Sequence, residues 1–273
     1  MKKTGTVRVI CGIAALLVLL GCAAALWAAR NTFTYSNLAD AKSRQTAQQL
    51  LRGQGVGEES LERFFEQVDA FNAVPYAGLV ESGWKKALAP FFAYDDAAGF
   101  SHLDHQQTDE RVGCRAAAFL LMRDVIAFTE PESGTASAGR KDEMQTQRLF
   151  SQREQENYDR LYADVAYHGG ETAEELAAQL TDYWQQAGIA FPSGEIQLVT
   201  AYGVASDIFQ NFHTAVAVDT EDGVWLIEKA DPIHPFQLSH FTTQAQLLSY
   251  MKHRVREAKC AAVFSNDTCL WMK

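Results

Sequence analysis

Two runs of strand-forming residues, separated by a short polar turn, constrain this sequence most strongly. Residues 213–219 and 223–229 are rich in β-branched and apolar side chains, and Thr220-Glu221-Asp222 lies between them, followed by Gly223. This pattern predicts an antiparallel hairpin. Residues 195–200 alternate in the same way, with Ile196 and Leu198 in phase. The second half of the chain is therefore predicted to form an antiparallel sheet.

The register of this hairpin decides which side chains share a face. If Val218 pairs with Trp225, His213 falls opposite Ala230, and Glu228 becomes the diagonal neighbour of His213 on the same face. A shift of one residue would turn Glu228 to the other face of the sheet.

The first half is predicted to be mainly helical. A helix beginning at Glu58 places its apolar residues at helical spacing, on one face: Leu61, Phe64, Phe65, Val68 and Phe71. A polar helix is expected to run to about Tyr167, and Thr172 and Glu175 predict a capping box for a helix that ends at Gly188. The expected fold class is therefore α+β.

Size and charge limit the function classes. The chain has 273 residues, of which 47% are hydrophobic and 21% charged, enough to build one core from residues 31–273. Residues 130–147 are small and charged without an apolar period, and are expected to form an exposed loop. The formal net charge of −10 repels phosphate backbones and argues against a nucleic-acid partner.

The N-terminus is predicted to target the protein to a membrane. Lys2, Lys3 and Arg8 precede an uncharged run over residues 9–29, which Arg30 closes. At about 1.5 Å per residue, a helix of this length matches a hydrocarbon core of roughly 30 Å. The preceding positive charges favour a cytoplasmic N-terminus, so residues 31–273 are expected outside the cytoplasm.

Three fates of residues 1–30 lead to the same compartment. An uncleaved signal anchor is the leading prediction, because the apolar run continues past Cys22. Leu19-Leu20-Gly21-Cys22 resembles a bacterial lipobox, although Leu20 is bulkier than usual, and lipidation at Cys22 is the second possibility. Cleavage near Ala28 would instead release the domain. The expected location is the extracytoplasmic face of the cell membrane, anchored or lipidated, or the secreted fraction.

Three of the five cysteines lie outside residues 1–30. Cys260 and Cys269 flank two short extended segments around a Ser-Asn-Asp turn, which makes a local disulfide between them sterically reasonable. Cys114 would then be a free thiol in an exported domain, either reactive or simply buried.

Cys114 stands at the start of a predicted buried helix. Gly113-Cys114-Arg115 leads into an apolar run over residues 116–128, which ends before Pro131. A thiol at a helix N-terminus is shifted toward thiolate by the macrodipole and by free backbone N–H groups. The same N–H groups can stabilise an oxyanion.

A cysteine nucleophile needs a base and a group that orients the base. Cys114, His213 and Glu228 are predicted to fill the roles of nucleophile, general base and orienting residue. Asp231 and Asp219 are weaker candidates for the third role. A side-chain donor to the oxyanion could come from Gln106, Gln107 or Asn72.

No cofactor is required for this chemistry. A metal site is not favoured, because no second cluster completes the ligands that a polar stretch offers in His102, Asp104 and His105.

Several segments together resemble the DUF4300 family of exported proteins from Gram-positive bacteria, over roughly residues 35–255. The segments are Tyr35-Ser36-Asn37-Leu38-Ala39-Asp40, Phe71-Asn72, Gly113-Cys114-Arg115 with its helix, Phe212-His213-Thr214-Ala215-Val216 and Leu226-Ile227-Glu228-Lys229. The histidine strand, turn and Glu-Lys strand also look like the corresponding part of NlpC/P60-type and other papain-like amidases. That likeness implies a papain-like α+β arrangement, with a buried helix led by Cys114 packed on an antiparallel sheet.

The expected function is that of an exported, membrane-tethered, papain-like cysteine hydrolase. It would be an amidase, peptidase or acyl transferase acting on an amide or ester of a peptide, cell-wall peptide or lipid-linked acyl group. The alternative from another class is a non-catalytic envelope binding protein in which Cys114 is structural. A third reading is a sensor with a reversibly oxidised Cys114, which would leave His213 without a role.

Overall fold

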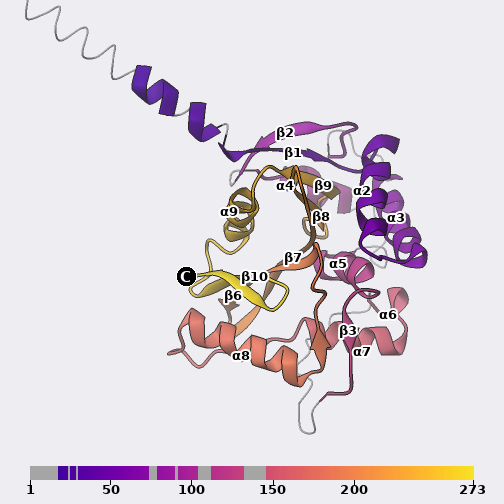
Figure 1. Ribbon diagram of the computed structural model, residues 1–273, viewed down its shortest axis with the longest axis vertical. Coiled ribbons are helices and arrows are strands. Elements are labelled where there is room, and N and C mark those ends of the chain that lie inside the picture. The colour runs from indigo at the N-terminus through magenta and orange to yellow at the C-terminus, as the bar shows by residue number, and fades with distance from the viewer. Residues whose placement is uncertain are drawn as a thin grey trace, which may run out of the picture.

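The computed structural model describes residues 18–23, 25–28, 30–73, 79–89, 92–103, 112–131 and 146–273. Helices and an antiparallel sheet are both present in these ranges, so the predicted α+β class is confirmed (Figure 1).

A large antiparallel sheet organises the described part of the chain. Its strands, in spatial order, are β11 (Thr268–Met272), β10 (Ala261–Ser265), β6 (Ile196–Ala205), β7 (Ile208–Thr220), β8 (Gly223–Lys229), β9 (Phe236–Phe241), β1 (Thr32–Ser36) and β2 (Lys85–Leu88). The short strand β4 (Val165–Ala166) also pairs with β7. The predicted hairpin is thus β7 and β8, at the centre of the sheet.

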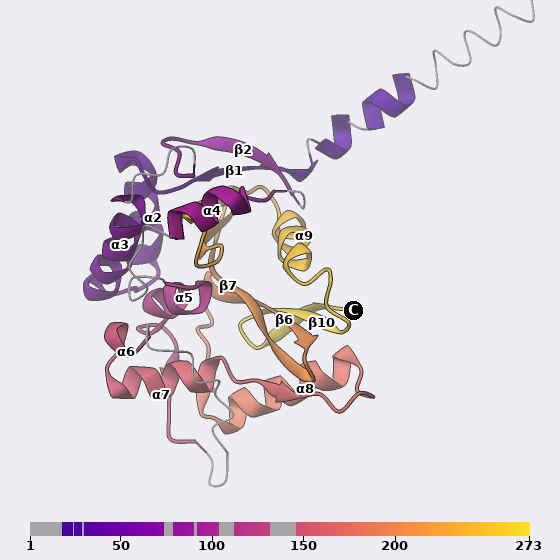
Figure 2. The ribbon, with the colours of Figure 1, turned by 180° about the vertical axis from the view of Figure 1, so that it is seen from behind.

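The helices cover both faces of this sheet. Their bounds are α2 (Ala41–Gly53), α3 (Glu58–Ala73), α4 (Asp96–Leu103), α5 (Cys114–Met122), α6 (Thr146–Leu149), α7 (Gln152–Leu161), α8 (Ala173–Gln186) and α9 (Gln244–Arg254). Figures 1 and 2 place α9 on one side of β7, and α5 and α3 on the other. Each side has its own apolar cluster, one including Val199, Ala215 and Leu247, the other including Phe64, Phe119 and Val216.

Local signals explain where several helices begin and end. The predicted capping box is confirmed at α8, where the Thr172 side chain accepts from the Glu175 backbone N–H and the Glu175 side chain accepts from the Thr172 backbone. Gly188, at φ +69°, follows this helix, and a Cβ there would lie 2.6 Å from the hydroxyl oxygen of Thr129. Only glycine fits both constraints.

Two predicted helices are shorter than expected. The helix that begins at Cys114 ends at Met122 rather than near Phe128, because Ala127 and Phe128 form strand β3 with β5 (Ile189–Ala190). The helix expected to reach Tyr167 ends at Leu161, and β4 follows it. The run after Cys114 is apolar without a polar side and does not distinguish helix from buried strand, so a partner distant in the sequence decided where that helix ends.

The predicted disulfide between Cys260 and Cys269 is wrong. β10 and β11 form the predicted extended pair, but Cys269 lies opposite Phe264, four residues along the strand from Cys260. Both thiols are free. Because a strand advances about 3.3 Å per residue, the two Cα atoms are too far apart for an S–S bond.

The segment before β1 is helical where it is described, in residues 18–23 and 25–28, and projects away from the domain (Figure 1). Its last described turn contacts the start of the sheet: the Thr32 hydroxyl donates to the Ala28 carbonyl at 2.7 Å, and β1 begins at Thr32. None of the helices in the described ranges combines the length and apolar character needed to cross a membrane. Residues 9–17 of the apolar run lie outside those ranges.

Candidate functional site

Cys114 is the first residue of α5, and the helix is buried from Ala116 to its end. Gly113 is the N-cap and provides no side-chain cap, so the first N–H groups of α5 are left for other partners. Ala116 through Met122 are all buried, and α5 packs on β7 and β8. The position of Cys114 is therefore fixed by the core of the protein.

His213 lies directly after a β-bulge in β7 and keeps the regular alternation of the rest of that strand. Ala201 of β6 pairs with His213, but the next residue, Tyr202, pairs with Asn211, which leaves Phe212 as the extra residue. Ala201 belongs to the apolar cluster on the α9 side and Tyr202 to the opposite cluster. His213 and Asn211 therefore face opposite sides of the sheet, and His213 faces α9.

The register of the hairpin is the predicted one. Val218 pairs with Trp225, and Glu228 lies on the same face as His213. The Nε2 atom of His213 is 2.5 Å from Oε2 of Glu228, and both side chains are buried. Since Nε2 faces Glu228, Nδ1 is the ring nitrogen left for Cys114.

Cys114 and His213 meet beyond the paired part of the hairpin. The pairing of β7 with β8 begins at Val216, so Thr214 and His213 lie where the two strands have separated. Burial raises the pKa of the Cys114 thiol, but a hydrogen bond with His213, the charges of His213 and Arg115, and a backbone hydrogen bond from Thr214 lower it more. The net shift is downward, in the direction of a thiolate.

The pKa of His213 shifts in the complementary direction. Burial and the charge of Arg254 lower it, whereas hydrogen bonds with Cys114 and Glu228 and the charge of Glu228 raise it more. A lowered thiol pKa beside a raised imidazole pKa is the electrostatic pattern of a thiolate–imidazolium pair.

Glu228 is held by residues that sequence analysis did not select. Its Oε1 accepts from the Tyr250 hydroxyl at 2.5 Å and from the Gln237 amide at 3.3 Å. Arg254 places Nη2 3.6 Å from Oε2. Tyr250 and Arg254 are four residues apart in α9, a spacing that puts them on one helix face, but nothing local shows which sheet residue that face meets.

A second arm of hydrogen bonds reaches the N-terminal part of the domain. The Tyr94 hydroxyl donates to Oε1 of Gln237 at 2.5 Å and accepts from the Asn37 amide at 2.6 Å. Gln237 also donates to Ser239 at 2.6 Å. Asn37 belongs to the Tyr35-Ser36-Asn37-Leu38-Ala39-Asp40 segment on which the resemblance to the DUF4300 family partly rests, so this segment contributes to the surroundings of Glu228.

The weaker candidates for the third role lie elsewhere. Asp231 is 2.5 Å from Nδ1 of His234 and accepts from the backbone of Ile233. Asp219 accepts from Gln197 and Gln244 at the opposite end of β7. Among the three carboxylates considered, only Glu228 contacts His213.

Of the three candidates for an oxyanion donor, only Asn72 lies within the described residues. The Asn72 amide donates to the backbone carbonyl of Asn37 at 3.5 Å. Gln106 and Gln107 lie outside the described residues, as do Asp104 and His105. Within the ranges that are described, no group of three or more His, Cys, Asp or Glu residues could hold a metal ion.

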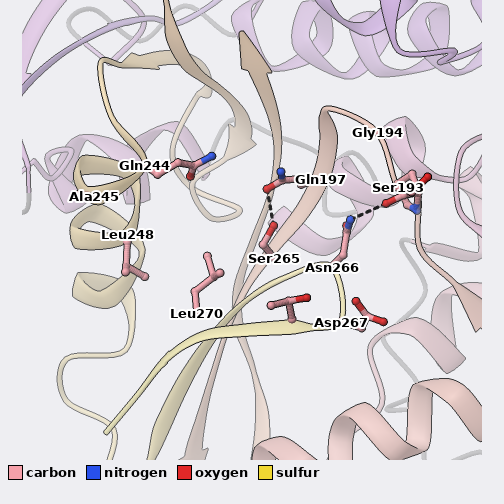
Figure 3. Close-up of a pocket in the computed structure, with 12 residues that line it drawn as sticks. Ser193, Gly194, Gln197, Gln244, Ala245, Leu248, Ser265, Asn266, Asp267 and Leu270 are labelled. Carbon is pink, nitrogen blue, oxygen red and sulfur yellow. Dashed lines mark hydrogen bonds between the residues drawn. The ribbon is translucent and has the colours of Figure 1, made fainter. Parts of the chain in front are cut away.

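A separate pocket of about 570 Å³ lies between the start of α9 and the turn joining β10 to β11. Figure 3 shows Gln244 and Leu248 on one side of it and Ser193 on the other. Its polar side chains largely bind one another or the backbone, as in the Asn266 bond to the Pro192 carbonyl at 2.9 Å. None of Cys114, His213 and Glu228 lines it.

Fold and site together define an α+β protein with a cysteine at a helix N-terminus and a buried histidine–glutamate pair on the adjoining sheet. The chain belongs to the family described as domain of unknown function (DUF4300), whose family model matches residues 34–269. Comparison with the curated proteins found no match, and comparison with the solved structures found none either.

Proposed function

We propose that this protein is a cysteine-dependent hydrolase or acyl transferase that acts on an amide or ester. The observation that carries the proposal is the convergence of Cys114, His213 and Glu228, which come from a helix and two strands. His213 lies between the other two, bonded to Glu228 at 2.5 Å and interacting with the Cys114 thiol. A thiol, a base and an acid in this order are the parts of a nucleophilic triad.

The proposed reaction begins with proton transfer from the Cys114 thiol to Nδ1 of His213. The thiolate attacks the carbonyl carbon of the substrate, and the backbone N–H groups at the start of α5 stabilise the oxyanion that forms. When the C–N or C–O bond breaks, His213 returns the proton to the leaving amine or alcohol. Water or another acceptor then attacks the thioester carbonyl, and His213 takes the proton of the attacking group. The C–S bond breaks, which releases the acyl product and restores the Cys114 thiolate.

We assign Glu228 the role of orienting His213. An ionised carboxylate accepts from Nε2–H, which keeps that nitrogen protonated and leaves the lone pair of Nδ1 facing the thiol. A helix led by the nucleophile and packed on an antiparallel sheet that carries the base is also the arrangement of papain-like enzymes, and we propose that the fold is of this kind.

The proposed substrate is an envelope peptide, a cell-wall peptide or a lipid-linked acyl group. The support is the location that residues 1–30 favour, with Lys2, Lys3 and Arg8 before an uncharged run. Val18, Leu19 and Leu20 are exposed in the helix that precedes the domain, as expected of a segment that contacts lipid. Retention of the full chain in membranes after carbonate extraction would support this tether, and its release would oppose it.

The pH dependence of Cys114 alkylation tests the proposed pair. Iodoacetamide is applied to the full chain in detergent, and the modified cysteine is identified by peptide mapping. Cys114 is expected to react with an apparent pKa below the ordinary thiol value of about 8.5, and His213→Ala is expected to restore that value. Cys269 serves as the internal control, because burial raises the pKa of its thiol.

A Cys114 that becomes reactive only on unfolding would contradict the hydrolase and favour a non-catalytic binding protein. If the pair is confirmed, peptide amides and thioesters are the substrates to screen, with Cys114→Ser as the control that should abolish turnover.

A further inference from the structure

Two side chains of α9 contact the carboxylate of Glu228, which projects from β8 toward that helix. Tyr250 donates its hydroxyl to Oε1 at 2.5 Å, and Nη2 of Arg254 lies 3.6 Å from Oε2. Nη2 of Arg254 also donates to the Tyr250 hydroxyl at 2.5 Å. The three groups therefore form one connected cluster.

The carboxylate of Glu228 is fully enclosed. Oε1 accepts from Tyr250 and Gln237, Oε2 faces His213 and Arg254, and the side chain has 0% exposure. A buried carboxylate ionises readily only when a nearby positive charge compensates for lost hydration. His213 provides that charge only when it is protonated, whereas the guanidinium of Arg254 is always charged.

The charge state of Glu228 decides what His213 can do. While Glu228 is ionised, it can only accept, so Nε2 of His213 carries the hydrogen and Nδ1 presents a lone pair to Cys114. If Glu228 were protonated, it could donate to Nε2, and the ring would present Nδ1–H to the thiol. A ring in that tautomer could not take the proton of Cys114.

We propose that Arg254 and Tyr250 are positioning residues that keep Glu228 ionised and so hold His213 in the tautomer that can accept a proton from Cys114. The inference rests on the proposed function, since it assigns these residues a task at the same site. Neither side chain needs to touch a substrate for this role.

The electrostatics of the cluster agree with its geometry. Burial raises the pKa of Glu228, but the charge of Arg254, the bond and charge of His213 and the Tyr250 bond lower it more. The Tyr94 hydroxyl is linked to the carboxylate by way of Gln237, to which it donates. The charge of Asp231 raises the pKa of Arg254 and so favours its charged form. Arg254 also lowers the pKa of His213, so it limits the imidazolium as well as stabilising the carboxylate.

The test is the pH profile of Cys114 alkylation in full-chain variants. In Arg254→Met, Glu228 should keep its proton to higher pH. The acidic limb of the alkylation rate profile should therefore move to higher pH. At pH 6 the rate of Cys114 alkylation should fall about tenfold. This loss is smaller than the roughly 10²- to 10⁴-fold that a positioned general base contributes. Arg254→Lys should restore most of the rate, because it keeps the charge. Arg256→Met is the matched control, since Arg256 is exposed and pairs with Glu257.

Tyr250→Phe removes one hydroxyl without emptying the core, and should shift the profile in the same direction by less. It also decides the matter if Arg254→Met does not fold. A Tyr250→Phe profile and an Arg254→Met profile that coincide with wild type would overturn the inference. So would an Arg254→Lys variant that behaves like Arg254→Met.

A second readout separates this inference from the proposed function. The ¹³C chemical shift of the Glu228 carboxyl reports its protonation directly and should show a higher titration midpoint in Arg254→Met. If His213→Ala leaves Cys114 reactivity unchanged, the proposed triad fails. If that variant restores the ordinary thiol pKa while neither Glu228 nor the alkylation profile responds to Arg254→Met, the triad stands and the positioning role fails.

Discussion

Val218 of β7 lies directly opposite Trp225 of β8, and this pairing determines the face on which Glu228 emerges. Because side chains alternate along a strand, a slip of one residue would have directed Glu228 away from His213. In the observed register, the carboxylate reaches Nε2 of His213 at 2.5 Å. The geometry of the candidate triad thus depends on a hairpin register that its turn and its apolar pattern specify.

Glu228→Gln is expected to lower the pKa of His213. The Glu228 carboxylate raises that pKa by its charge and its hydrogen bond, and an amide retains only a hydrogen bond. Titration of the histidine ring protons by NMR measures the change. His253 is the control, because burial and the charges of Arg256 and Arg254 set its lowered pKa. An unchanged His213 midpoint would mean that the carboxylate is not the dominant influence on the ring.

Lys229→Met is expected to stabilise the protein more at pH 7 than at pH 10. Lys229 is 1% exposed, and burial holds its pKa well below the usual range against the opposing charge of Asp231. A base with a lowered folded pKa binds fewer protons when folded than when unfolded, so the wild type gains stability as pH rises toward the unfolded pKa of about 10.4.

Urea unfolding at the two pH values measures this difference. The exposed Lys86→Met variant is the control and should show no comparable pH dependence. If the free-energy difference between Lys229→Met and wild type is the same at both pH values, Lys229 is not buried as the structure shows.

Thr172→Ala should cost about 1 kcal/mol in the free energy of unfolding, because it removes the N-cap of α8 and one half of its capping box. Thr181→Ala in the same helix is the matched control. The Thr181 hydroxyl donates to the Ala177 carbonyl within the helix, and alanine is the better helix former, so this variant should be neutral or slightly stabilising. Equal losses for the two variants would argue against a capping effect.

Cys260 and Cys269 should remain in separate peptides when the protein is digested without reduction. Both thiols are free, and each lies near a backbone carbonyl, Cys260 near Glu171 at 3.9 Å and Cys269 near Trp271 at 3.5 Å. Mass spectrometry of the unreduced digest checks this. Recovery of a peptide pair joined through Cys260 and Cys269 would show that the β10–β11 hairpin is arranged differently.

Local patterns correctly predicted the elements whose signals are complete within a short window. The α8 capping box at Thr172 and Glu175 and the β7–β8 hairpin are of this kind. The end of the helix after Cys114 was not predicted correctly, because residues 127 and 128 are as compatible with a strand as with a helix. Pairing with β5, about sixty residues further along the chain, decided the end of α5.

The sequence by itself determined the three candidate residues, Cys114, His213 and Glu228, since each stands at a predictable place on a helix or strand. Only the tertiary structure decided what surrounds them. α9 packs on the face of the sheet that carries His213, and it brings Tyr250 and Arg254 to Glu228. Periodicity reports which face of an element is apolar, but it does not report which other element that face will meet. The packing of helix on sheet, driven by apolar burial over the whole domain, sets the environment of the buried carboxylate.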